Sequence, residues 1–176
     1  PGVVIPRGVG AAAEINYGAS PEPDFRPLAR GRIPVRGMTE KDLRSMIEID
    51  HSITGRVREE YFRSKLTEAL RDSNVRVSLV AECEGVPAGF IMARVDLGEF
   101  GRIEPVAIID TIGVDPDYRG QGVGRALLSQ LLANLSTLRV ERVRTELSWR
   151  ERELLSFLDR CGFEPSQTLS FDRAIV

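Results

Sequence analysis

The spacing of apolar residues predicts two helices at the start of the folded part of the chain. The first follows Thr39, a suitable N-cap residue, and its apolar stripe consists of Leu43, Met46, Ile47 and Ile53. Gly55 interrupts this pattern, as expected where a helix ends. A second stripe at helical spacing predicts another helix from about Arg58 to Asp72, with a charged and solvated outer face.

Beyond residue 75 the apolar period changes to two, which predicts strands. Segments 75–83 and 90–97 are joined by the short sequence EGVPAG, so they should form a hairpin. Segment 105–114 is almost wholly apolar and should be a central strand covered on both faces; its one charged residue is Asp110. The remaining predicted elements are helices within 123–135 and 148–162 and strands within 33–39, 140–147 and 167–176.

The order of these elements predicts the fold class. An antiparallel start followed by alternating helices and strands indicates an α/β (α+β) fold, with a mixed, mostly antiparallel central sheet of about six or seven strands and helices on both faces. A chain of 176 residues suits a single domain, which we place at residues 32–176. Residues 1–31 are rich in Pro, Gly, Ala and Arg without a period, so we expect an extended or flexible N-terminal arm.

Composition narrows the function classes. The chain is 42% hydrophobic and 28% charged, typical of a soluble globular protein, and its net charge of -2 gives no global attraction for nucleic acid or a membrane surface. We find neither a signal peptide nor an apolar run of membrane-spanning length, and therefore expect a cytoplasmic location. Two distant cysteines and one histidine, His51, offer little for a metal site, so we predict none.

The sequence DPDYRGQGVGRALL, residues 115–128, places three glycines directly before a leucine-rich helix. Free N–H groups at a helix start can hold an anion such as a diphosphate, and glycine lets a ligand approach the backbone. A nucleotide-hydrolysing P-loop would need Lys and Ser or Thr after the last glycine, where Arg125 and Ala126 stand. A dinucleotide fold would need G-x-G-x-x-G at its first strand, whereas this G-x-G-x-G occurs late.

With Val114 before it, this segment closely resembles the R-x-x-G-x-G acyl-CoA-binding motif of the GNAT superfamily of N-acetyltransferases. The resemblance extends from about Ile33 to Val176, because IIDTIGV before the motif and FLDRCGF after it occur in the family's order. It implies a GNAT-like fold with acetyl-CoA as co-substrate and no metal. The implied cofactor-binding residues are Ile112, Gly113 and Val114 along the pantetheine arm, and Arg119, Gly120, Gln121, Gly122, Val123, Gly124 and Arg125 around the pyrophosphate.

Acyl transfer to an amine needs help with a proton, because a lysine-like amine is almost fully protonated at neutral pH. Asp110 is the first candidate catalytic base, and an equally weighted alternative is a structural carboxylate bonded to backbone or to an arginine. Glu104 is the second candidate base. The family analogy places an oxyanion-binding N–H at a bulge near Ile112 or Gly113.

One position departs from the family. Many relatives have a tyrosine that protonates the leaving thiolate where this chain has Leu158. Trp149 could line the acceptor entrance, although core packing is at least as well supported.

These features predict an acyl-CoA-dependent N-acyltransferase that passes an acetyl group directly to a primary amine on a protein lysine, an N-terminus or a small molecule. The alternative is a non-catalytic acyl-CoA-binding sensor or regulatory module, which Leu158 favours and Asp110 opposes. We expect no nucleic-acid or membrane partner, and the sequence leaves a homodimer open.

Overall fold

The computed structural model describes residues 33–71, 76–96, 105–167 and 173–175. The predicted N-terminal arm, Glu104 and most of the last predicted strand lie outside these residues. The described elements are β1 (Val35–Gly37), the 3-10 turn η2 (Glu40–Asp42), α1 (Leu43–Thr54), α2 (Glu59–Arg71), β2 (Arg76–Cys83), β3 (Val86–Asp96), β4 (Val106–Val114), the 3-10 turn η3 (Pro116–Tyr118), α3 (Val123–Thr137), β5 (Arg142–Thr145) and α4 (Arg152–Arg160).

The five described strands form one mixed sheet in the order β1-β2-β3-β4-β5. The pairs from β1 to β4 are antiparallel, and only β4 and β5 run parallel. The mostly antiparallel sheet was predicted, but the expected six or seven strands are too many for the described residues. The last predicted strand is not seen at residues 173–175, which have no regular structure.

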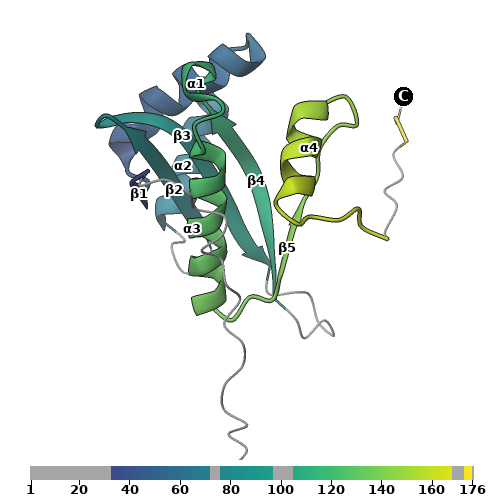
Figure 1. Cartoon of the computed structure of the whole chain (residues 1–176). Helices are drawn as coiled ribbons and strands as arrows, with labels where there is room; N and C mark the ends of the chain where they lie inside the picture. The colour runs from purple at the N-terminus through teal and green to yellow at the C-terminus, as the bar shows by residue number, and fades with distance from the viewer. Residues whose placement is uncertain (1–32, 72–75, 97–104, 168–172, 176) are drawn as a thin grey trace, which may run out of the picture.

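Helices cover both faces of the sheet, as predicted. In Figure 1, α3 lies in front of the sheet, while α1 and α2 lie behind it. The core on the α3 side includes Ile91, Ala107, Leu127 and Leu131, all fully buried. The core on the other side consists mainly of Met46, Ile49, Phe62, Leu66, Val80, Phe90 and Met92.

The hairpin of β2 and β3 is tighter than the sequence predicted. Glu84 and Gly85 both have positive φ, at 53° and 79°, and they alone make the turn. This two-residue turn matches the twist of its flanking strands, so β3 already begins at Val86. Much of the predicted connection EGVPAG is therefore strand.

A charged cluster connects β1 to the start of α1. Asp42 accepts hydrogen bonds from the backbone N–H and the hydroxyl of Thr39, at 2.7 and 2.9 Å. Two guanidinium nitrogens of Arg36 also donate to this carboxylate, each at 2.8 Å. Thr39 thus begins the helical segment as predicted, and Arg36 stabilises the buried charge of Asp42.

Candidate functional site

The connection from β4 to α3 is held at its start by Asp115. The Asp115 N–H donates to the carbonyl of Ala88 at 2.9 Å, and its carboxylate accepts from the N–H of Asp117 at 3.0 Å. Tyr118 packs against the core on the α3 side. The loop therefore leaves the end of β4 in a defined direction.

Gly120 and Gly122 have left-handed backbones, with φ of +76° and +92°. An L side chain is strained in this region, so both positions favour glycine. A Cβ at Gly120 would have nothing within 4 Å, and one at Gly122 would meet only Ile33 Cδ1, at 3.9 Å. The space beside this stretch of backbone is open, which allows a ligand close to the peptide groups.

The first turn of α3 has N–H groups available to a ligand. Gly122 is the N-cap residue and has no side chain that could cap the helix. The N–H of Ala126 makes the first helical bond, to the Gly122 carbonyl at 2.9 Å. The N–H groups before it have no acceptor within the helix, and the helix dipole makes this end attractive to an anion.

Gly124 differs from the other two glycines because it serves helix packing. A Cβ there would lie 3.2 Å from Phe157 Cζ and 3.3 Å from Cε2, so the Phe157 ring would have to shift by a few tenths of an ångström to admit a side chain. Close packing therefore accounts for one glycine of the motif, while backbone conformation accounts for two.

The polar side chains of the loop have partners on neighbouring segments. Arg119 forms an exposed ion pair with Glu153 of α4 at 3.3 Å, and Gln121 donates to the Asp117 carbonyl at 3.4 Å. Arg125 lies against Cys161; burial raises the pKa of this thiol, and the arginine acts in the opposite direction. Both arginines thus contact α4, at the start and just past the end of that helix.

The predicted pantetheine strand lies where β4 and β5 separate. The two strands pair only from Val106↔Arg142 to Ile109↔Thr145, and they then diverge toward α4 (Figure 1). At the last pair, the Thr145 hydroxyl donates to the Ile109 carbonyl at 3.2 Å. Residues 110–114 therefore have no β5 partner in the described structure, so this edge of β4 is open to a ligand with amide groups.

Gly113 is needed on this strand because of packing. A Cβ there would lie 2.8 Å from the Phe90 ring and 3.4 Å from Ile53 Cδ1. Ile112 and Val114 instead pack against the core on the α3 side. The bulge expected near Ile112 or Gly113 occurs earlier, at Asp110, where β3 passes from Met92↔Thr111 to Ala93↔Ile109.

Asp110 lies on the α2 side of the sheet with only 9% of its side chain exposed. One carboxylate oxygen pairs with the guanidinium of Arg94, and the other lies 3.9 Å from the ammonium of Lys65. Of the two alternatives weighed from the sequence, bonding to an arginine is present. The role of Asp110 or Glu104 as a base stays a prediction.

Sequence reasoning missed Arg94 and Lys65. Arg94 carries a signal in retrospect, because it is a cation within the otherwise apolar run FIMARV, complementary to Asp110 in the next strand. Lys65 carries no such signal, because a charged residue in this helix is expected on its solvated outer face; its side chain is instead only 24% exposed and reaches Asp110.

Positions after β5 also matter for the chemistry. Leu158, which replaces the family's tyrosine, is 6% exposed and has no proton to donate. Trp149 is 83% exposed, so the core-packing alternative is wrong. Glu151 accepts a hydrogen bond from the Ser148 N–H at 3.0 Å, and α4 begins at Arg152, later than the start of the helix predicted within residues 148–162.

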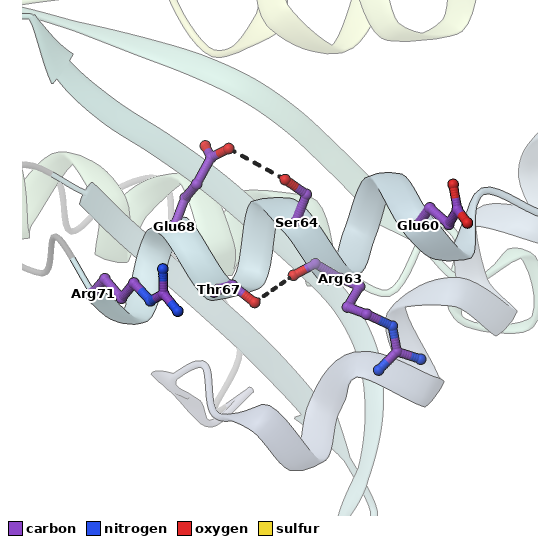
Figure 2. Close-up of a pocket in the computed structure, with 6 residues that line it drawn as sticks. All are labelled: Glu60, Arg63, Ser64, Thr67, Glu68 and Arg71. Carbon is purple, nitrogen blue, oxygen red and sulfur yellow. Dashed lines mark hydrogen bonds between the residues drawn. The ribbon is translucent and has the colours of Figure 1, made fainter.

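A surface hollow of about 460 Å³ lies elsewhere, along α2 (Figure 2). All its lining residues come from this one helix, and they bond with one another: Thr67 donates to the Arg63 carbonyl at 2.8 Å, and Ser64 lies 3.3 Å from the Glu68 carboxylate. This is the charged outer face predicted for α2.

Metal-binding clusters and membrane-spanning helices are both absent from the described residues. These residues contain no group of three or more His, Cys, Asp or Glu side chains arranged to hold a metal ion. Their helices are too short or too polar to cross a membrane.

A model of the acetyltransferase (GNAT) family matches residues 43–163, from the start of α1 to just beyond α4. The chain belongs to this family. The match includes the glycine loop and both strands at the separation of β4 and β5.

Two curated proteins are similar to about half of this GNAT chain. A mycothiol acetyltransferase of Propionibacterium freudenreichii subsp. shermanii is 32% identical over an alignment of 94 residues, and the match covers 47% of this chain and 30% of that protein. An uncharacterized N-acetyltransferase of Methanocaldococcus jannaschii is 32% identical over 92 residues, 51% of this chain and 40% of that protein. The matched part is thus less than half of either relative's length.

The fold of this GNAT chain also resembles solved structures. One is the aminoglycoside N-acetyltransferase AAC(6')-Iy in complex with a CoA-linked bisubstrate analog, with a TM-score of 0.70 at 18% identity. The likeness covers 83% of this chain and 100% of that one. It confirms the predicted fold class.

Proposed function

We propose that this chain is an N-acetyltransferase that transfers an acetyl group from acetyl-CoA to a primary amine. The observation that carries the proposal is the uncapped start of α3 behind two left-handed glycines, beside the open edge of β4. A diphosphate needs several N–H donors and close approach to the backbone, and this segment offers both. The amides of a pantetheine arm can bond to residues 112–114 as an added strand would.

The side chains around the loop support the same ligand. Gly120 and Gly122 leave open the space that a Cβ would fill, which suits the phosphates. Arg119 and Arg125 add positive charge at the rim, and the partner of Arg119 is an exposed glutamate that a phosphate can replace. We assign Gln121, Val123 and Gly124 to the same binding segment through their backbone N–H groups.

In the proposed reaction, the neutral amine attacks the thioester carbonyl carbon. The new C–N bond forms, the C–S bond breaks, and CoA leaves as a thiolate. The acceptor ammonium first loses one proton to water or to a carboxylate, for which Asp110 and Glu104 are the candidates from the sequence. After the attack, the nitrogen loses a second proton to water as the amide forms. A CoA-like thiol ionises near pH 8.5, so a thiolate can leave without the tyrosine that Leu158 replaces.

The acceptor is a primary amine on a protein lysine, an N-terminus or a small molecule. The structural relative named as an aminoglycoside N-acetyltransferase supports including amino-sugar amines among these candidates. We place the reaction in the cytoplasm, in keeping with two free cysteines.

A second candidate function is a non-catalytic acyl-CoA sensor. The burial of Leu158 favours it, because no hydroxyl is available at the position of the family's general acid. Such a protein would bind CoA through the same loop but would not release thiol.

The test has two parts. Calorimetry with CoA and with ATP measures binding, and thiol release from acetyl-CoA is followed with lysine peptides, free N-termini, polyamines and amino sugars. We expect CoA binding without ATP binding, and release that depends on one amine class. CoA binding with background release for every amine would favour the sensor. If Gly122→Glu binds CoA as tightly as the surface control Arg44→Gln does, the assignment of the CoA site to this loop is wrong.

A further inference from the structure

Asp110 occupies a singular position in β4. Every other residue from Val106 to Val114 has a Cα partner on β3, but Asp110 is skipped by the bulge. Pairing with β5 has also ended, one residue earlier, at Ile109. Asp110 therefore lies at the bulge, one residue beyond the last β4–β5 pair and two residues before the segment 112–114 that is proposed to hold the pantetheine arm.

The Asp110 carboxylate is tied to two other elements at this point. Arg94 lies on β3 opposite Ile108, so its ion pair with Asp110 runs diagonally across the bulge. Lys65 reaches the other oxygen from α2 at 3.9 Å, and its ammonium also lies 3.8 Å from Glu68. These contacts connect Asp110, at the bulge in β4, to β3 and to α2.

A carboxylate with 9% exposure is costly to bury without compensation, and the two neighbouring cations offset that cost. Both carboxylate oxygens lie near cations, so an incoming ammonium ion would have to compete with Arg94 and Lys65 for this carboxylate. The same contacts restrain the backbone of Asp110, and thereby the direction in which residues 111–114 leave the bulge.

We infer that Asp110 is a positioning residue: its ion pair with Arg94 sets the course of residues 111–114 along the thioester, and it does not accept the proton of the amine. This inference rests on the proposed acetyl transfer. A small error in the direction of this segment would displace the thioester from the acceptor, and misplacement of about 1 Å can cost on the order of 100-fold in rate.

The experiment compares Asp110→Asn, Arg94→Gln and the double variant in amine-dependent thiol release across pH. We expect each single variant to lower kcat on the order of 10- to 100-fold with an unchanged shape of the pH profile. The double variant should be no slower than the slower single variant, because both remove one interaction. Arg44→Gln, which removes an exposed pair with Glu48 on α1, is the matched arginine control and should keep wild-type kcat.

Two results would overturn the inference. One is wild-type kcat in Arg94→Gln; the other is loss of the acidic limb of the pH profile in Asp110→Asn alone, the behaviour of a base. Thermal melting and CoA affinity report folding in every variant. If Asp110→Asn does not fold, Arg94→Gln and Arg94→Lys carry the test, with a smaller loss of kcat expected for the lysine.

Hydrogen exchange of residues 111–114 separates this inference from the proposed function. Exchange there should rise in Asp110→Asn and in Arg94→Gln, whether or not the wild-type protein releases thiol. A wild-type protein without thiol release would defeat the proposed function, whereas unchanged exchange in both variants would defeat the positioning role.

Discussion

Replacement of Gly122 by alanine tests the glycine loop without introducing a clash. At φ +92° the new Cβ strains the backbone, which costs about 1–2 kcal/mol of stability. Packing adds little, because the nearest atom, Ile33 Cδ1, lies 3.9 Å away. For a chain of this size, 1 kcal/mol lowers Tm by about 2–4 °C, so we expect a decrease of about 2–8 °C.

The same methyl group would stand in the open space before α3. If it displaces one charge-assisted hydrogen bond to a phosphate, the loss is about 1.5–3 kcal/mol of binding free energy. Since about 1.4 kcal/mol corresponds to a factor of ten, CoA affinity should fall about 10- to 100-fold.

Gly85→Ala is the matched control for this variant. Gly85 has φ +79° with nothing within 4 Å of the position a Cβ would take, and it lies in the turn between β2 and β3. It should lower Tm by a similar amount and leave CoA affinity unchanged. Calorimetric titration and thermal melting measure both quantities. Equal CoA affinity in the two variants would refute the reasoning that phosphates approach the backbone at Gly122.

Other predictions concern stability. Phe62→Ala should cost about 3–5 kcal/mol in urea unfolding, because this fully buried ring packs edge-to-face on Phe90; a loss below about 1 kcal/mol would contradict that packing. Gly124→Val should cost about 1–3 kcal/mol through its contact with Phe157, and a Phe157→Ala background should relieve part of that cost, which a double-mutant cycle measures. The Arg36 guanidinium holds the pKa of Asp42 below its usual 3.8, so the stabilisation is present above that pH and is lost as pH falls through the lowered pKa. The stability difference between wild type and Arg36→Met should therefore shrink below pH 3.8, and a difference that stays constant in acid unfolding would argue against the pair.

Most of the secondary structure followed from local patterns. The stripe of α2 predicted residues 58–72 and the helix spans Glu59–Arg71, because helical amphipathicity is a property of the segment itself. The strand after α3 was predicted at residues 140–147 but is only Arg142–Thr145. This strand ends where its pairing with β4 ends, at Ile109↔Thr145, and the local sequence of the short segment does not show where that pairing stops.

The sequence by itself determined the loop before α3 and its capacity for an anion. The tolerance of glycine for positive φ and the free N–H groups of a helix start are local properties, so the roles of Gly120 and Gly122 could be recognised from the sequence alone. Only the tertiary structure decided that Gly124 serves packing against Phe157, since that contact joins helices far apart in the chain.

The same division applies to Asp110. Its place in an apolar strand marked it as unusual from the sequence alone, because a buried charge requires compensation. Only the tertiary structure decided that Asp110 pairs with Arg94 and Lys65, because these residues lie on β3 and α2. It also decided that the bulge falls at Asp110 and that β5 separates from β4 just before it. The physical reason for this division is the range over which each interaction acts. A dihedral preference acts within one residue, whereas charge pairing and strand register depend on groups that the whole fold brings together.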